Sequence, residues 1–326
     1  QILQEGINEA GAMSAWIAAA TSYSNHDTQM IPFYVFYSMF GFQRIGDLAW
    51  AAGDSRARGF LMGGTAGRTT LNGEGLQHED GHSHVLAATI PNCISYDPAY
   101  GHEIAVIIRD GLRRMVGEQE DVFYYLTIAN ENYRHPPLPE DSEEGILRGM
   151  HLVAKPDGRR KAKVRLLGSG PILREALGAA ELLAEDFDIP AEVWSVTSWT
   201  ELRRDGLAAD RQARLGASGD RRETWVERCL GTEPGAPVVA TSDYMKALPD
   251  GIRPWVHSRF AVLGTDGYGR SDWRRELRDF FEIDRRHVAV AALQALADEG
   301  KGPRSAVKGA IERYEIDPEK PDPAVS

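Results

Sequence analysis

Apolar residues in the first part of the chain follow two spacings, one helical and one extended. Residues 10–22 are rich in alanine and place Met13, Ile17 and Ala20 at helical spacing, which predicts a buried helix. Short apolar runs with aromatic or β-branched residues predict strands, the first of them buried. These strands are 30–36, 59–62, 90–96 and 122–128, and the further helices are 44–52 and 105–115. Because strands and helices alternate, we predict an α/β fold with a doubly wound, mainly parallel sheet.

A proline-rich stretch interrupts this pattern. Residues 135–141 (HPPLPED) cannot continue a strand or a helix, and a polar segment follows them. We therefore predict a linker, 135–162, between a first domain, 1–134, and a second doubly wound α/β domain, 163–326. The second domain begins with a strand and glycine turn at 163–170 and a helix at about 172–185. Its other predicted strands are 191–196, 238–241 and 260–263, and its other helices are 273–281 and 288–297.

The glycine turn Gly168-Ser169-Gly170 matches part of a dinucleotide-binding fingerprint. The third glycine of G-x-G-x-x-G would fall at Leu173, so the close packing of helix on strand which that glycine permits is not supported. A structural turn is the favoured interpretation, and nucleotide binding is the alternative.

The composition of the chain argues against several classes of function. The 326 residues are 42% hydrophobic and 26% charged, which is ordinary for a globular protein with two cores. A formal net charge of −11 argues against nucleic acid or an anionic membrane as the main partner, and short basic clusters such as Arg274-Arg275 are interpreted as solvated faces. No apolar run approaches the roughly 20 residues that span a bilayer. Cys93 and Cys229 offer neither a metal spacing nor a disulfide framework, so we expect a cytoplasmic protein.

The densest group of chemically active residues lies at 67–84 (GRTTLNGEGLQHEDGHSH), called the 67–84 segment below. It contains three histidines and three acids in a stretch too rich in glycine for a helix. A catalytic or ligand-binding loop is favoured over a merely solvated one. The active residues are Glu74, His78, Glu79, Asp80, His82 and His84.

Within this segment, His78 to His82 satisfies the H-E-x-x-H pattern of zinc hydrolases. That motif requires a helix, because both histidines must reach one zinc from the same face. Gly73, Gly75 and Gly81 each disfavour a helix by roughly 1 kcal/mol relative to alanine. A zinc hydrolase is therefore an unfavoured alternative.

Five longer blocks carry a more specific signal. They are GINEAGAMSAW from Gly6, MIPFYVFYSMFGFQRIGDLAW from Met30, the 67–84 segment, IPNCISYDPAY from Ile90 and LGTDGYGRSD from Leu263. Together they closely resemble the homodimeric, bacterial-type pyruvate dehydrogenase E1 components, over the pyrimidine-binding domain and the C-terminal domain of that larger, transketolase-like family. The resemblance implies pyruvate as substrate, thiamine diphosphate and Mg²⁺ as cofactors, and transfer of the acetyl group to a lipoyl-bearing E2 acyltransferase.

The same resemblance implies roles for residues around the cofactor. Glu9 of the GINE motif matches a glutamate that hydrogen-bonds the aminopyrimidine and promotes its activation, and burial beside the helix at 10–20 would keep its carboxyl protonated. Phe40 matches the aromatic residue that packs on the aminopyrimidine, and Tyr37 matches a tyrosine beside the cofactor. Arg44 is either a donor on the pyrimidine side or an exposed helical arginine. Without the resemblance, Tyr37 and Phe40 would be taken as core residues.

For the 67–84 segment, the resemblance assigns His78 to the surroundings of the substrate carbon, where proton transfer is needed. Glu74 is expected to orient or tune His78. Asp80, His82 and His84 are expected around the substrate as supporting residues, and spacing alone gives them no separate roles.

One departure from the family concerns the diphosphate and the metal. The family binds both through a GDG motif followed by an asparagine, whereas here Gly46-Asp47 continues to Leu48 and Asp266-Gly267 has no asparagine after it. No metal ligand is therefore expected in this chain, and the diphosphate would be bound by the remaining N-terminal part of E1. Because Gln1 is not an initiator methionine, we expect the chain to be part of a longer protein. A non-catalytic dimerisation and docking module is the alternative for the isolated chain.

Overall fold

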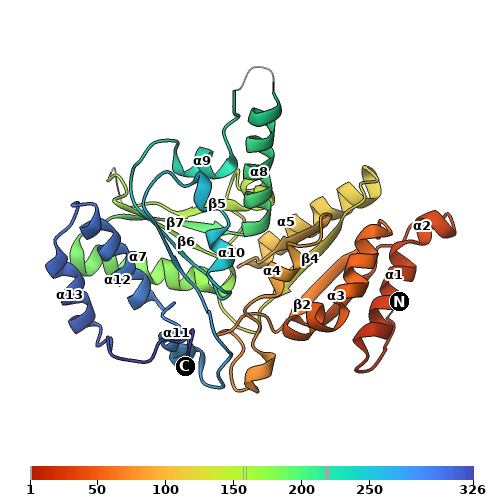
Figure 1. Ribbon diagram of the computed structural model, residues 1–326, viewed down its shortest axis with the longest axis horizontal. Helices are drawn as coiled ribbons and strands as arrows, with labels where there is room; N and C mark the ends of the chain where they lie inside the picture. The colour runs from red at the N-terminus through yellow and green to blue at the C-terminus, as the bar shows by residue number, and fades with distance from the viewer. Residues whose placement is uncertain (1, 157, 159, 217–219) are drawn as a thin grey trace.

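Two sheets, each flanked by helices, form the two halves of the molecule in the computed structural model (Figure 1). The structure describes residues 2–156, 158, 160–216 and 220–326. The first sheet is parallel, with the order β1-β2-β4-β3. The second has the order β5-β7-β6-β8-β9, and only β5 runs antiparallel to its neighbour. The predicted α/β fold with two mainly parallel sheets is confirmed.

The strands are short, and the carboxyl ends of neighbouring parallel strands lie next to each other. In the first sheet they are β1 Phe33–Tyr37, β2 Phe60–Gly64, β3 Cys93–Tyr96 and β4 Phe123–Ile128. In the second they are β5 Met150–Ala154, β6 Val164–Gly168, β7 Ala191–Val196, β8 Val238–Thr241 and β9 Phe260–Leu263. Since the carboxyl ends of parallel strands share one edge of a sheet, the loops that leave these ends lie where α/β proteins carry their chemistry.

The helices surround the sheets on both faces. In the first half they are α1 Glu9–Ala20, α2 Ser22–Asn25, α3 Ser38–Asp54, α4 Ser83–Ala87, α5 Gly101–Leu112 and α6 Glu143–Arg148. In the second half they are α7 Leu173–Phe187, α8 Trp199–Leu215, α9 Trp225–Leu230, α10 Ala247–Asp250, α11 Arg274–Phe280, α12 Arg285–Asp298 and α13 Arg304–Arg313. Within the described residues, none combines the length and apolar character needed to cross a membrane.

Strand β1 differs from its prediction as a buried strand. It lies at the edge of the first sheet, and Phe33 and Val35 are 50% and 66% exposed. Helices α1 and α3 cover one side of the strand. The aromatic run therefore belongs to an edge strand that is not buried on both faces.

The segment predicted as a linker contains two elements. Helix α6 lies within 135–162, and β5 pairs antiparallel with β7, so the second sheet begins before the predicted residue 163. The short MHLVA run of β5 follows a polar stretch directly, and an antiparallel edge strand has no βαβ pattern that would reveal it.

Gly168-Ser169-Gly170 forms the structural turn that was favoured for it. Gly170 has φ +51°, and a Cβ on Gly168 would lie 2.7 Å from Cα of Leu173. The close approach of helix to strand therefore exists here, but Gly168 rather than a third glycine permits it.

The two halves meet through buried polar groups. Glu103 on α5 accepts hydrogen bonds at Oε1 from the Ser195 hydroxyl (2.7 Å) and contacts Nε2 of His151 at 2.8 Å. Its Oε2 accepts from the backbone N–H groups of Ala99 and Tyr100. Burial alone would raise the pKa of Glu103, but these hydrogen bonds hold it below its usual value.

Replacing Glu103 by glutamine should lower the free energy of unfolding by about 2–3 kcal/mol, because an amide cannot accept all of these hydrogen bonds. Urea denaturation at neutral pH measures the change. Glu312→Gln, on the exposed face of α13, should change stability little. Equal stability of the Glu103 variant and the native chain would contradict this role.

Candidate active site

Three aromatic rings from different elements meet beside the carboxyl end of β1. Tyr37 ends β1, Phe40 lies in the first turn of α3, and His78 ends a single 3₁₀ turn, Leu76–His78. The centroid of the His78 ring lies 4.9 Å from that of Phe40 and 5.4 Å from that of Tyr37. Nδ1 of His78 is buried without a hydrogen-bond partner among the described residues. This group therefore combines flat apolar faces with an unused ring nitrogen.

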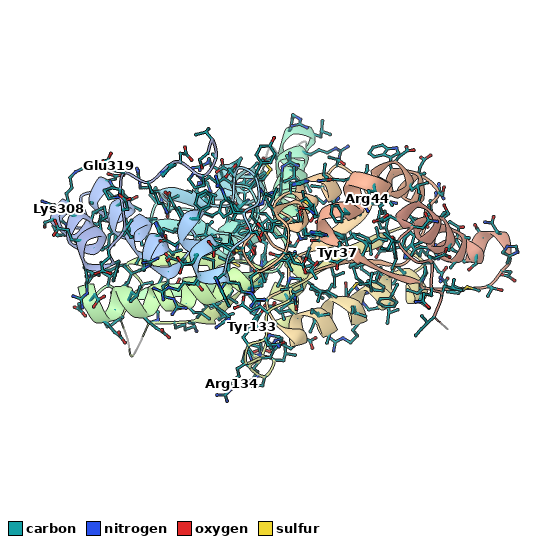
Figure 2. The ribbon with its side chains drawn as sticks, turned by 90° about the horizontal axis from the view of Figure 1, so that it is seen from below. Tyr37, Arg44, Tyr133, Arg134, Lys308 and Glu319 are labelled. Atoms are coloured by element: carbon teal, nitrogen blue, oxygen red, sulfur yellow. The ribbon has the colours of Figure 1, made fainter. Side chains whose placement is uncertain are left out.

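An ion pair extends the group. The Arg44 guanidinium lies 4.2 Å from the centroid of Phe40, four residues earlier on the same face of α3. Arg44 also forms a short hydrogen bond and ion pair with Glu9. Glu9 begins α1, whose Asn8 cap accepts the N–H of Gly11 at 3.0 Å. We call Glu9, Tyr37, Phe40, Arg44 and His78 the aromatic–carboxylate cluster; Figure 2 labels Tyr37 and Arg44 on the first half of the molecule.

The environment of Glu9 differs from the sequence-based prediction. Its side chain is 20% exposed and forms an ion pair with Arg44, so the carboxyl is partly rather than fully buried and already has a charged partner. Helix α1 packs its other side, including Met13 and Trp16, against the core.

The residues that follow His78 point in two directions, some towards α3 and others towards the interior of the molecule. His82 lies beside α3, with its Nε2 3.0 Å from Nε2 of Gln43. Asp80 is buried and caps α4, because its Oδ1 accepts the backbone N–H groups of His82 and Ser83. In the described structure, Asp80 therefore has a structural role in helix capping.

His84 points into the interior of the molecule. Its Nε2 lies 3.0 Å from the Thr127 hydroxyl, and its ring contacts those of Tyr125 and Tyr244. Complete burial lowers the pKa of His84 to about 4, so the ring is neutral at physiological pH. The Thr127 hydroxyl in turn donates to Asp97 at 2.7 Å.

Glu74 is exposed and makes no hydrogen bond with His78 in the described structure. Its backbone oxygen instead accepts the Ser271 hydroxyl from the second half. The structure thus brings together Glu9, Tyr37, Phe40, Arg44 and His78, with His82 nearby, but not Glu74.

Asp243 follows β8 and holds the 67–84 segment, although it was not among the predicted site residues. Its Oδ1 accepts the N–H (2.8 Å) and hydroxyl (2.7 Å) of Thr69, and its Oδ2 accepts the N–H (3.1 Å) and hydroxyl (2.6 Å) of Thr70. Gly67 has φ +95°, and a Cβ there would lie 2.2 Å from Oδ2. The sequence signal is the position of Asp243 two residues after the end of a strand.

Glu79 attaches the same segment at a second point. Its Oε2 accepts the backbone N–H of Arg270 at 2.6 Å, and its Oε1 has no partner among the described residues. Burial raises the pKa of Glu79 to about 8, although the Arg270 N–H opposes that shift.

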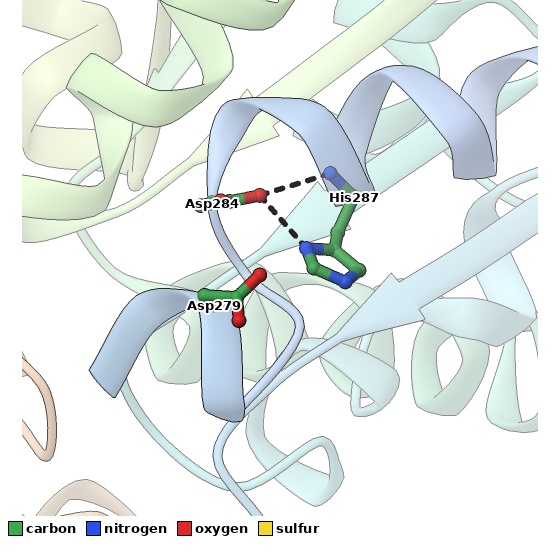
Figure 3. Close-up of side chains that lie close together, drawn as sticks. All are labelled: Asp279, Asp284 and His287. Atoms are coloured by element: carbon green, nitrogen blue, oxygen red, sulfur yellow. Dashed lines mark hydrogen bonds and ion pairs between the residues drawn. The ribbon is translucent and has the colours of Figure 1, made fainter. Parts of the chain in front are cut away.

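The zinc alternative loses its structural basis. Only residues 76–78 form a helical turn, so His78 and His82 do not share the face of an α-helix. Within the described residues, a metal-like group of side chains occurs elsewhere, at Asp279, Asp284 and His287 (Figure 3). There Asp284 caps α12, and Arg286 binds both aspartates, so part of the negative charge is already matched.

Comparison with known sequences agrees with this geometry. Residues 1–136 match the family described as the pyruvate dehydrogenase E1 component middle domain, and residues 149–284 match the transketolase-like C-terminal domain. Over 99% of its length the chain is 62% identical to the pyruvate dehydrogenase E1 component of Pseudomonas aeruginosa, and it is 55% identical to that of Escherichia coli over 100%.

The chain belongs to the pyruvate dehydrogenase E1 component family. This confirms the resemblance expected from the sequence. The chain spans 37% and 36% of the lengths of these two relatives.

Solved structures support the fold of this chain. The transketolase of Campylobacter jejuni superposes with a TM-score of 0.63 at 15% identity, covering 85% of this chain and 38% of its own. A split-gene transketolase, described as an inactive β4 tetramer, gives a TM-score of 0.61 at 15% identity, covering 90% of this chain and 83% of its own. At such identities the likeness concerns the fold alone.

Changing Asp243 to asparagine should release the first part of the 67–84 segment. The amide nitrogen cannot accept the Thr hydrogen bonds, so we expect a loss of about 2 kcal/mol in the free energy of unfolding. Hydrogen exchange at the Thr69 and Thr70 amides should also accelerate. Asp250→Asn, at an exposed side chain, is the control. Unchanged exchange at both threonines would show that Asp243 does not hold the segment.

Glu79 should make stability depend on pH. Its folded-state pKa of about 8 lies above its usual 4.5, so the folded state binds a proton that the unfolded state releases. Stability due to this group is present below about pH 4.5 and is lost as pH rises towards 8. Glu79→Gln should reduce the decline between pH 5 and 8 by roughly 1 kcal/mol per pH unit.

Urea unfolding at several pH values measures this decline. Asp97, whose pKa burial raises to about 7, contributes in the same direction, so some decline remains in the Glu79 variant. The exposed Glu74→Gln change is the matched control. A decline in Glu79→Gln as steep as in the native chain would refute the assignment.

Proposed function

We propose that this chain supplies the aminopyrimidine-binding part of a thiamine diphosphate site in a pyruvate dehydrogenase. The complete enzyme would decarboxylate pyruvate and transfer the acetyl group to a lipoyl group on E2. The observation that carries this proposal is the aromatic–carboxylate cluster, in which residues from α1, β1, α3 and the 67–84 segment meet around Phe40. Family membership supports the reaction, since the relatives are named for it.

The cluster fits the flat, nitrogen-containing half of this cofactor. Phe40 and Tyr37 offer aromatic faces, Glu9 offers a carboxyl, and His78 has an unpartnered Nδ1. Thiamine diphosphate, when bound, supplies an electron sink for decarboxylation. Glu9 would hold a proton against a ring nitrogen, with Arg44 competing for or sharing its carboxyl. His78 would exchange a proton at Nδ1 near the substrate.

The described residues do not fit the diphosphate and Mg²⁺. The metal-like group at Asp279, Asp284 and His287 is bound to Arg286, in the second half. We propose that residues outside this chain hold the diphosphate and the metal, as the missing GDG motif indicates. The remaining part of E1 is then required for activity.

A homodimer is supported by the apolar surface of the first half. Phe33 and Val35 on the edge strand β1, Tyr37 at its end and Trp50 on α3 are all about half exposed or more. Exposed apolar surface of this kind is common at subunit interfaces. We propose dimerisation through this face, in a cytoplasmic enzyme whose two cysteines are free thiols.

Glu9→Gln tests the proposed function. If the carboxyl moves a proton at the cofactor, thiamine diphosphate-dependent release of CO₂ from pyruvate should fall at least about 100-fold. The assay uses the protein that carries this chain, together with its intact mass, because a lone 36.0 kDa species is expected to be inactive. Cofactor binding followed by calorimetry gives a second readout.

The exposed Glu5→Gln change, four residues earlier, is the control and should retain activity. Full activity of Glu9→Gln would contradict the cofactor role of Glu9. Activity of the isolated chain at the rate of a complete E1 would contradict the requirement for residues outside it.

A further inference from the structure

A second, chemically distinct cavity lies in the second half, away from the aromatic–carboxylate cluster. It has a volume of about 440 Å³ and is bordered by α7, α11, the start of α12 and the segment after β4. This volume is within the range of small-molecule sites. Five of its lining residues are arginines: Arg274, Arg275, Arg278, Arg285 and Arg286.

The acids around the cavity pair with most of these arginines. Glu131, Glu175 and Asp284 also line the cavity, and Asp279 and Glu276 beside it form ion pairs with Arg286 and Arg275. The whole chain carries a net charge of −11, so five guanidinium groups around one cavity are a local concentration of donors for an anion.

Three of the arginines are paired with acids. Arg278 bonds Glu131 and Glu175, and Arg285 donates its Nε to Glu175 at 3.1 Å. Arg286 bonds Asp279 and Asp284. These pairs keep the wall of the cavity in place.

Arg274 and Arg275 are the two arginines with the weakest pairing. Arg274 donates only to the backbone oxygens of Thr70 and Asn130, with no carboxylate partner in the described part of the chain. Arg275 is 86% exposed, and its recorded ion pair is the 3.9 Å contact with the adjacent Glu276. The interpretation of Arg274-Arg275 as a simple solvated face is therefore wrong for Arg274.

A buried donor points to a missing acceptor. The Arg278 side chain is 6% exposed, and its Nε has no hydrogen-bond partner among the described residues. Leaving a buried donor of a charged group unpaired is unfavourable. An anion in the cavity that Arg278 lines would supply the acceptor.

We propose that this cavity binds the phosphate group of a small phosphorylated metabolite. A phosphate carries close to two negative charges and several acceptor oxygens, which matches the two weakly paired guanidinium groups of Arg274 and Arg275 and the one unpaired N–H of Arg278. The remaining volume accommodates an organic portion. The site is separate from the proposed thiamine diphosphate site, and Arg274 and Arg278 connect it to Thr70 of the 67–84 segment.

Calorimetric titration with inorganic phosphate tests the proposal. The titration is done at constant ionic strength with thiamine diphosphate already present, so that a cofactor site cannot take up the probe. Saturable binding is expected, and Arg275→Gln should weaken it about tenfold through loss of one charge-assisted contact. Arg275 is too exposed for this change to disturb folding.

Arg274→Gln provides a second test, with circular dichroism to verify its fold. The control removes the same charges on α8, through Arg211→Gln and Arg214→Gln, which lie on an exposed surface. Unsaturable binding to the native chain would overturn the proposal. So would native affinity in both Arg275→Gln and a folded Arg274→Gln, or an equal loss in the α8 control.

Discussion

The four hydrogen bonds at the Asp243 carboxylate determine how the two halves of this chain cooperate. They join the end of β8 to Thr69 and Thr70, just after β2, across 173–174 positions of sequence. Because each carboxylate oxygen accepts one N–H and one hydroxyl, the direction of the backbone at both threonines is specified as well as its position. The 67–84 segment has little regular structure of its own, so these contacts replace the ladder of hydrogen bonds that a strand or helix would provide.

The contact between the halves is polar in other places too. Glu103 binds His151 and Ser195, and the Ser198 hydroxyl donates to the backbone oxygen of Ser95 at 2.6 Å. Buried polar groups are costly when unpaired and directional when paired, so an interface of this kind favours one relative orientation of the halves. An apolar interface of equal size would permit more sliding. The position of His78 relative to α3 thus depends on residues that never touch it.

How far the sequence predicted this arrangement depends on how local each signal is. Helix α1 and strands β2 and β4 follow from the sequence because α1 repeats its buried residues at helical spacing and the two strands are continuous buried apolar runs. Strand β1 was misjudged because the same aromatic run fits an edge and a centre, and β5 was missed because an antiparallel edge strand has no βαβ pattern that would reveal it. In such cases the sequence shows that a residue is apolar but not which element packs against it.

The candidate site shows the same limit. Glu9, Tyr37, Phe40, Arg44 and His78 were selected through family resemblance, and they do meet in space. The resemblance could not reveal that Glu9 is partly exposed and paired with Arg44, because that depends on side-chain packing. Asp243 and Glu103 act through distant partners, and a single aspartate or glutamate in a sequence carries no sign of such partners.

The 67–84 segment contacts the interior of the molecule on one side and helix α3 on the other, and this explains its composition. Glu79 and Asp80 turn towards the interior, where they bind the Arg270 N–H and the start of α4, while His78 and His82 lie against α3. Two consecutive residues that face the interior, between histidines that face α3, do not follow the alternation of a strand, and the glycines allow such an irregular backbone. Acids on one side hold the segment in place, so the histidines on the other side can remain open to a ligand. The density of titratable residues is therefore a consequence of joining structural and chemical roles in one short stretch of chain.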